Sequence, residues 1–175
     1  MKRWLAGIAA LLVAALAAYW FGLRDETVGA QLRIPPATAT IGSGTDAIAV
    51  GPRGQILAWL PLPEEVQLPM LPISAPPQSG RLAGPVLQQA RVLGAAPATL
   101  RPYIESSYYG ESGVDVNLRS GIELRFGDAS QAPTKWKAAA SVLADPSITT
   151  LDYVDLHAPR RPAIGGSGHT LPSLE

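Results

Sequence analysis

The feature that most constrains this chain is an uncharged, mostly apolar run from Trp4 to Leu23, directly after Met1-Lys2-Arg3. About 20 apolar residues let an α-helix cross the hydrocarbon core of a bilayer, where only a helix satisfies its own backbone hydrogen bonds. Aromatic residues gather at 19–21 and Trp4 lies at the other end, as is typical of the two membrane interfaces. The sequence therefore predicts a transmembrane helix over 4–23.

The charges around this run predict its orientation. Lys2 and Arg3 are uncompensated, whereas Arg24 is followed at once by Asp25 and Glu26. Positive residues stay on the cytoplasmic side, so we expect residues 1–3 to form a cytoplasmic end and the rest to lie outside. This describes a single-pass, type II protein of the cell membrane that contacts lipid through residues 4–23. The alternative is a cleaved secretory signal, for which the apolar run is long.

The composition excludes several classes of function. Formal net charge is zero and no basic stripe is present, which argues against nucleic-acid binding. The chain has no cysteine, which rules out disulfides and thiolate zinc sites. It has 17 prolines and 17 glycines, many of them between apolar segments, which favours a strand-and-turn domain over a helical bundle.

The predicted fold class is α+β, with an N-terminal single transmembrane helix followed by a mostly antiparallel β-sheet domain with two helices, at 37–165. The helices are expected at 85–93 and 132–144, because Pro85 and Pro133 suit a first helical turn. Gly94 would follow the first helix at C′, and Asp145-Pro146 would end the second. The other expected segments are a connector at 24–36, strands at 47–50, 55–59, 148–157 and 160–165, an extended path at 61–77 and a disordered tail at 166–175.

The clearest local signal lies between Val114 and Phe126, where apolar and polar residues alternate on both sides of Arg119-Ser120-Gly121. A three-residue hairpin loop of this kind needs a left-handed residue at its third position, which Gly121 supplies. This loop predicts four cross-strand pairs: Leu118 with Ile122, Val116 with Leu124, Val114 with Phe126 and, on the solvent face, Asp115 with Arg125.

Catalytic groups are scarce in this sequence. A Ser-His-Asp set can be assembled only from Ser147, His157 and Asp155, without a nucleophile elbow or an oxyanion hole. The glycines of segment 165–168 follow a strand but precede no helix, so they do not predict a phosphate site. We therefore expect no enzyme activity, no catalytic residue, no cofactor, no metal site and no small-molecule substrate. A hydrolase would need a deep pocket around His157.

The end of the chain offers a binding surface instead. The last strand of a sheet presents unpaired backbone N–H and C=O groups, to which an extended segment of another protein can be added. Tyr153 lies on the face opposite the expected core residues Val154 and Leu156, and Ile164 lies on the last strand. Arg160 and Arg161 precede it, and arginine and tyrosine are frequent in binding hot spots. These four residues are interface candidates: Tyr153, Arg160, Arg161 and Ile164.

Several short motifs follow one another over residues 36–166. They are Ala47 to Trp59, Leu68-Pro69-Met70-Leu71, Arg91-Val92-Leu93 followed by Leu100, Gly121-Ile122-Glu123-Leu124-Arg125-Phe126-Gly127-Asp128, Lys135-Trp136-Lys137, Tyr153-Val154-Asp155-Leu156 and Arg160-Arg161-Pro162-Ala163-Ile164. Their order and spacing are more specific than any single motif, and together they resemble those of the bacterial cell-division family FtsQ/DivIB.

The resemblance implies a non-enzymatic protein of the divisome, located at the division septum and acting in septum formation. In this family the terminal edge strand of the β domain accepts a strand from FtsB, of the FtsB/FtsL pair. The matching positions here are Arg160, Arg161, Pro162, Ala163 and Ile164. The alternative function is an envelope structural or adaptor protein unrelated to division.

One departure from the family concerns the interval between membrane and β domain. Family members carry a small POTRA domain there, which is associated with recruitment to the division site. Residues 24–36 are too few for an independent domain. The resemblance therefore carries over partner binding and leaves recruitment open.

Overall fold

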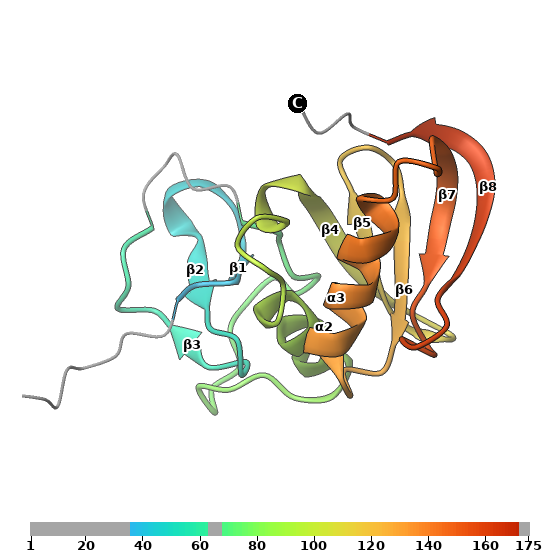
Figure 1. The fold of residues 1–175 in the computed structure, drawn as a ribbon. Helices are drawn as coiled ribbons and strands as arrows, with labels where there is room; N and C mark the ends of the chain where they lie inside the picture. The colour runs from blue at the N-terminus through green and yellow to red at the C-terminus, as the bar shows by residue number, and fades with distance from the viewer. Residues whose placement is uncertain (1–35, 63–67, 172–175) are drawn as a thin grey trace, which may run out of the picture. The chain divides into compact units, whose positions relative to one another are not determined.

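The computed structural model describes residues 36–62 and 68–171, which belong to one compact unit, Pro35–Glu175. Its strands form two sheets, with the orders β1-β2-β3 and β4-β5-β6-β7-β8 (Figure 1). The elements are β1 (Ala39–Ile41), η1 (Gly44–Asp46), β2 (Ile48–Val50), β3 (Ile56–Leu57), α2 (Gly84–Gly94), η2 (Arg101–Tyr103), β4 (Ile104–Gly110), β5 (Gly113–Leu118), β6 (Glu123–Gly127), α3 (Ala132–Leu143), β7 (Thr150–Asp155) and β8 (Ala163–Thr170).

The predicted fold class is wrong as an arrangement, although its α+β character with two helices is present. It placed a spanning helix ahead of a single sheet, whereas the described residues form two separate sheets. Within 36–62 and 68–171, no helix is long and apolar enough to cross a membrane. Residues 4–23, where the sequence predicts the spanning helix, lie outside the described residues, as do the end at 1–3 and the connector up to residue 35.

The small sheet is built around the turn Gly51-Pro52-Arg53-Gly54, which joins the predicted strands at 47–50 and 55–59 into a hairpin. Both strands are confirmed and are shorter than predicted. Val50 pairs with Ile56, and Gly54, whose φ is +73°, donates its N–H to the carbonyl of Gly51 at 2.9 Å. Strand β1, which the sequence did not predict, pairs antiparallel with β2. Part of the proline-punctuated path, at 68–71, runs beside β1 as an isolated parallel bridge.

The two predicted helices are confirmed, with one difference at the end of the first. Pro85 and Pro133 lie in the first turns of α2 and α3. Gly94 is the last residue of α2 and not its C′ residue. A Cβ at Gly94 would lie 2.5 Å from the Cα of Pro52, so this glycine permits the helix to pack closely against the hairpin turn.

The predicted hairpin between β5 and β6 is confirmed in its loop and in most of its register. Gly121 has φ +90°, and Leu118 donates its N–H to the carbonyl of Ile122 at 2.9 Å. The observed register matches the predicted one at two pairs and differs at the open end, where a bulge places Val114 opposite Gly127 and not opposite Phe126. The matching pairs are Asp115 with Arg125 and Val116 with Leu124.

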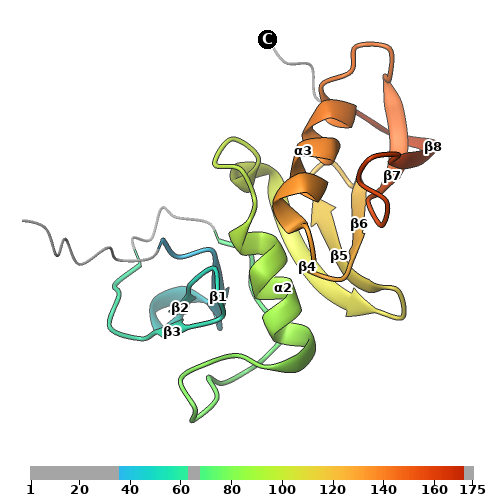
Figure 2. The same cartoon turned by 60° about the horizontal axis from the view of Figure 1, so that its bottom comes forward.

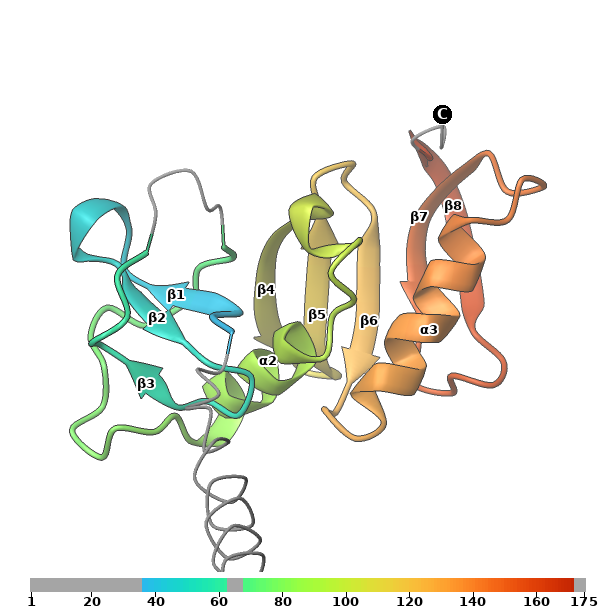
Figure 3. The same cartoon turned by 60° about the vertical axis from the view of Figure 1, so that its left-hand side comes forward.

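The five-stranded sheet contains one parallel pair, β6 with β7. Helix α3 connects these strands, and a parallel pair requires such a crossover. Helices α2 and α3 lie over the same face of this sheet, where α2 contacts β4 and β5 and α3 contacts β6 (Figures 2 and 3). Trp136 of α3 is fully buried there, with its Nε1 donating to the carbonyl of Val92 in α2 at 2.8 Å and its ring 4.9 Å from that of Phe126.

The C-terminal segment differs from the sequence prediction. Strand β8 runs from Ala163 to Thr170, so residues 166–170 form part of the sheet and not of a disordered tail. Residues 160–162, expected on the last strand, lie in the turn before it. The glycine-rich composition is compatible with a strand here because side chains of β7 occupy space that a Cβ would need: the Tyr153 hydroxyl would lie 2.6 Å from a Cβ at Gly165.

Candidate functional site

The candidate site is the outer edge of β8. This strand ends the order β4-β5-β6-β7-β8 and, among the described strands, pairs only with β7 (Figure 1). Six of its eight residues are exposed and the other two are half-buried. A terminal strand of this kind has one side of its backbone available for pairing with another chain.

The direction of each backbone group on this edge follows from β7. Leu156 donates its N–H to the carbonyl of Arg125 in β6 at 2.8 Å. Successive residues of a strand direct their N–H and C=O groups to alternate sides. Val154 therefore also bonds toward β6, whereas Tyr153 and Asp155 bond toward β8.

The same alternation identifies a residue of β8 whose backbone groups point to the open side. Tyr153 pairs with Gly165 and Asp155 with Ala163, so Gly165 and Ala163 direct their backbone groups toward β7. Ile164, between them, directs its N–H and C=O away from β7, to the open side. A strand added to β8 would form its first two backbone hydrogen bonds at Ile164.

The Ile164 side chain extends the apolar face of the sheet past its last covered strand. Ile164 stands opposite Val154, and directly opposed residues of an antiparallel pair share a face. Val154 is fully buried beneath the helices, whereas Ile164 is 45% exposed. The edge therefore presents an aliphatic side chain beside a free amide and carbonyl.

Tyr153 lies on the neighbouring strand β7 and on the opposite face of the sheet from Val154, as the sequence predicts. The guanidinium carbon of Arg125 is 4.0 Å from the centroid of its ring, a cation–π contact, and Arg125 also forms an ion pair with Glu123 at 2.5 Å. This cross-strand contact fixes the tyrosine ring over Gly165. The edge thus has an aliphatic group on one face and an aromatic ring on the other.

The arginines lie beside this edge and not on it. Arg160 and Arg161 are exposed in the turn before β8, and no ion pair with either is present among the described residues. Arg161 donates its backbone N–H to the carbonyl of Ala158 at 2.8 Å, which closes this turn. Pro162 follows at the entrance to the strand. Of the predicted site residues, Ala163 and Ile164 are on β8, Tyr153 is on β7 and the other three precede β8.

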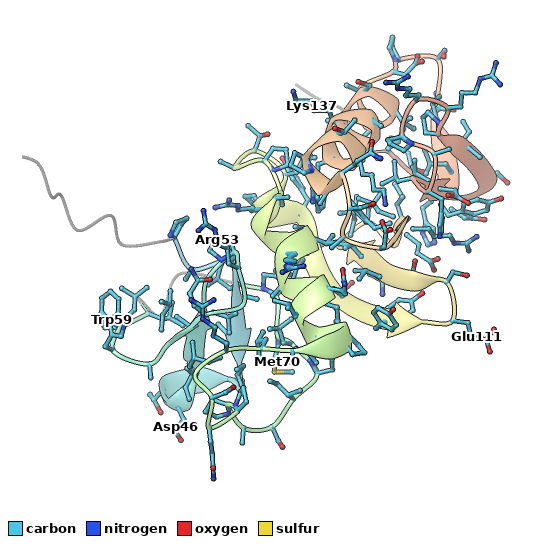
Figure 4. All side chains as sticks on the ribbon, turned by 90° about the horizontal axis from the view of Figure 1, so that it is seen from below. Asp46, Arg53, Trp59, Met70, Glu111 and Lys137 are labelled. Atoms are coloured by element: carbon cyan, nitrogen blue, oxygen red, sulfur yellow. The ribbon has the colours of Figure 1, made fainter. Side chains whose placement is uncertain are left out.

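The structure joins two members of the hypothetical Ser-His-Asp set and leaves out the third. The Nδ1 of His157 is 2.8 Å from the Oδ1 of Asp155, while the Ser147 hydroxyl donates to Asp145 at 2.6 Å. One hollow in the described surface is lined by Trp59 and Met70, two residues that Figure 4 labels. Another lies around Leu100, Ile122 and Leu143, and His157 lines neither of the two.

His157 instead ties the end of β7 to the turn between β4 and β5. Its Nε2 is 3.2 Å from the carbonyl of Ser112, so both ring nitrogens face acceptors and the doubly protonated imidazolium fits best. The hydrogen bond to Asp155 raises the pKa of His157. Burial raises the pKa of Asp155, but the hydrogen bonds from His157 outweigh it and leave this pKa below its ordinary value.

The predicted solvent-exposed pair between Asp115 and Arg125 is wrong. These residues stand opposite each other, but Asp115 is only 7% exposed and Arg125 pairs with Glu123. Burial and the nearby Glu123 raise the pKa of Asp115. Burial and Asp115 raise the pKa of Tyr108, which lies over this carboxylate, to about 12. The alternation of side chains predicted which face of the sheet carries Asp115, but not that Tyr108 of β4 covers it there.

Comparison with known proteins identifies no family. No family model matches the chain, and no curated protein matches it.

Proposed function

We propose that this protein is a non-enzymatic component of the bacterial divisome that binds FtsB/FtsL-type partners by adding a partner strand to β8. The observation that supports the proposal is the free backbone at Ile164, on a terminal strand that pairs only with β7 among the described strands. The sequence resemblance to FtsQ/DivIB names the partner class, and the edge geometry supplies a means of binding. Its location in the cell membrane and at the septum stays a prediction.

The geometry defines the partner segment. It must be extended, because β-strand addition relies on main-chain hydrogen bonds. The partner residue opposite Ile164 would lie on the helix-covered face and should be apolar, since it continues the row formed by Val154 and Leu124. Its neighbours in the partner strand would point to the face that carries Tyr153.

A proline substitution at Ile164 tests this directly, because it removes the outward N–H and leaves the bonds to β7 in place. Thr170→Pro is the matched control. Leu171 donates its N–H to the carbonyl of Thr149 at 3.1 Å, so the N–H of Thr170 also points outward, at the far end of β8. Both variants therefore lose one outward donor from the same strand.

The assay is capture of an FtsB/FtsL-type pair by the full chain in detergent, with thermal melting as the check of folding. We expect Ile164→Pro and Ile164→Lys to abolish capture, and Thr170→Pro to retain it. Deletion from Arg160 onward would remove all of β8 and uncover Val154, so it cannot separate binding from folding. Undiminished capture by folded Ile164→Pro would refute strand addition at this edge.

A further inference from the structure

Strand β8 does not follow β7 evenly along its length. Tyr153 stands opposite Gly165 and Leu151 stands opposite His169, so the three residues 166–168 of β8 face Asp152 alone. This is an enlarged β-bulge in the terminal strand. A bulge leaves residues unpaired, interrupts the ladder and increases the local twist.

The Asp152 carboxylate fills the bulge. Its Oδ1 accepts the N–H of Gly168 at 2.6 Å, and a Cβ at Gly168 would also lie 2.6 Å from this atom. Gly166 has φ +80°, and a Cβ there would collide with the Asp152 carboxylate. Gly166 and Gly168, which do not form a phosphate site, are therefore required to make room for the Asp152 side chain.

The bulge protects β8 against pairing with other chains, because the residues of β8 offer no other protection of this kind. Natural edge strands avoid pairing with further copies through lysine or other charges, through proline, or through bulges. From Ala163 to Thr170 the strand contains no lysine, arginine, acidic residue or proline. The bulge is the one device of this kind within the strand, and the single side chain of Asp152 holds its shape.

We propose that Asp152 is a positioning residue whose locked bulge prevents β8 from pairing with β8 of a second copy of this chain, and separates the regularly paired segment around Ile164 from the shorter one at His169 and Thr170. The part of this inference that concerns a partner strand rests on the proposed function. The part that concerns self-pairing stands on the structure of β8 alone. Without the carboxylate, the glycine run can straighten and offer all eight residues to another β8.

The test compares Asp152→Ala with Asp152→Asn, because the asparagine amide oxygen still accepts the Gly168 N–H. Asp152→Ser is a second variant whose side chain is too short to fill the bulge. The full chain in a mild detergent is measured by sedimentation, and thermal melting identifies the folded variants. A folded chain that carries Asp152→Ala together with Ile164→Pro shows whether association uses the β8 edge.

We expect the wild type and Asp152→Asn to sediment as single chains, and Asp152→Ala and Asp152→Ser to shift toward dimers or larger species. The Ile164→Pro substitution should return Asp152→Ala to single chains. If the folded Ala and Ser variants both remain single chains, the inference is overturned. No partner is needed in this assay, so a failed capture experiment would refute the proposed function while leaving this result to stand on its own.

Discussion

Replacement of the buried Lys135 by methionine should destabilise the domain. Its Nζ donates to the carbonyl of Phe126 at 2.8 Å, to the carbonyl of Asp128 at 3.0 Å and to the Oδ1 of Asp128 at 2.9 Å. These bonds close the end of β6 onto the first turns of α3. Methionine keeps an unbranched apolar side chain that reaches as far as Cε, and it removes the ammonium group that makes all three hydrogen bonds.

The magnitude follows from the burial of each acceptor. Phe126 is fully buried, so its carbonyl has no solvent to replace the ammonium, and an unsatisfied buried acceptor costs about 1–3 kcal/mol. The Asp128 side chain is 68% exposed, so water can replace the lysine there. The wild type must remove the Lys135 ammonium group from water when it folds, and the methionine variant avoids this cost, which offsets part of the loss. We expect a net loss of about 2 kcal/mol.

Lys137→Met is the matched control, because Lys137 lies exposed on the same helix (Figure 4). Urea unfolding of both variants and the wild type measures the difference in the free energy of unfolding. The control should stay within about 0.5 kcal/mol of the wild type. Equal stability of Lys135→Met and the wild type, or equal losses in the two variants, would refute the assigned role of Lys135.

The remaining predictions concern pH and backbone conformation. The pKa of His157 is raised in the folded state, so its protonation stabilises the fold. This stabilisation is complete below the unfolded-state pKa of about 6.5 and is lost as pH rises through the folded-state pKa. In urea titrations, the stability advantage of the wild type over His157→Gln should therefore shrink between about pH 5.5 and 8.5. A stability difference that stays constant with pH would show that protonated His157 does not stabilise the fold through Asp155 and Ser112. Gly121→Ala should cost more than Gly44→Ala in thermal melting: both glycines have positive φ, but only a Cβ at Gly121 meets a side chain, the His169 ring. Equal costs would show that the ring contact does not matter.

Local rules predicted the parts of the fold that neighbouring residues determine. The β5–β6 register follows from side-chain alternation and from the left-handed conformation that Gly121 supplies, and the structure has both. The starts of α2 and α3 were predicted from Pro85 and Pro133, because proline suits the first turn of a helix whatever lies elsewhere in the chain. These signals need no knowledge of residues far away in the chain.

The errors arose where distant segments meet. Alternation placed Asp115 in solvent, but Tyr108 of a strand not predicted as its neighbour covers it. Lys135 is buried because the end of β6 lies against it, a contact that helical spacing alone does not indicate. The parallel pairing of β6 with β7 was foreseeable, because a helix between two strands is the usual connection of a parallel pair.

The candidate site was predicted in outline. The sequence placed Tyr153 and Ile164 at the last strands, and the structure has them on opposite faces of the adjacent strands β7 and β8. It extended the tail over residues that belong to β8, because glycine and serine resemble linker composition. No sequence pattern indicated that the Asp152 side chain occupies a bulge on the neighbouring strand.

Amide hydrogen exchange at Ile164 tests the central claim most directly. The full chain is labelled alone and with an FtsB/FtsL-type pair, and the exchange of the Ile164 N–H is compared with that of Thr170 at the far end of β8. Strand addition predicts that partner binding slows exchange at Ile164 strongly while Thr170 stays as in the free chain. Partner binding that leaves Ile164 unprotected would contradict the account.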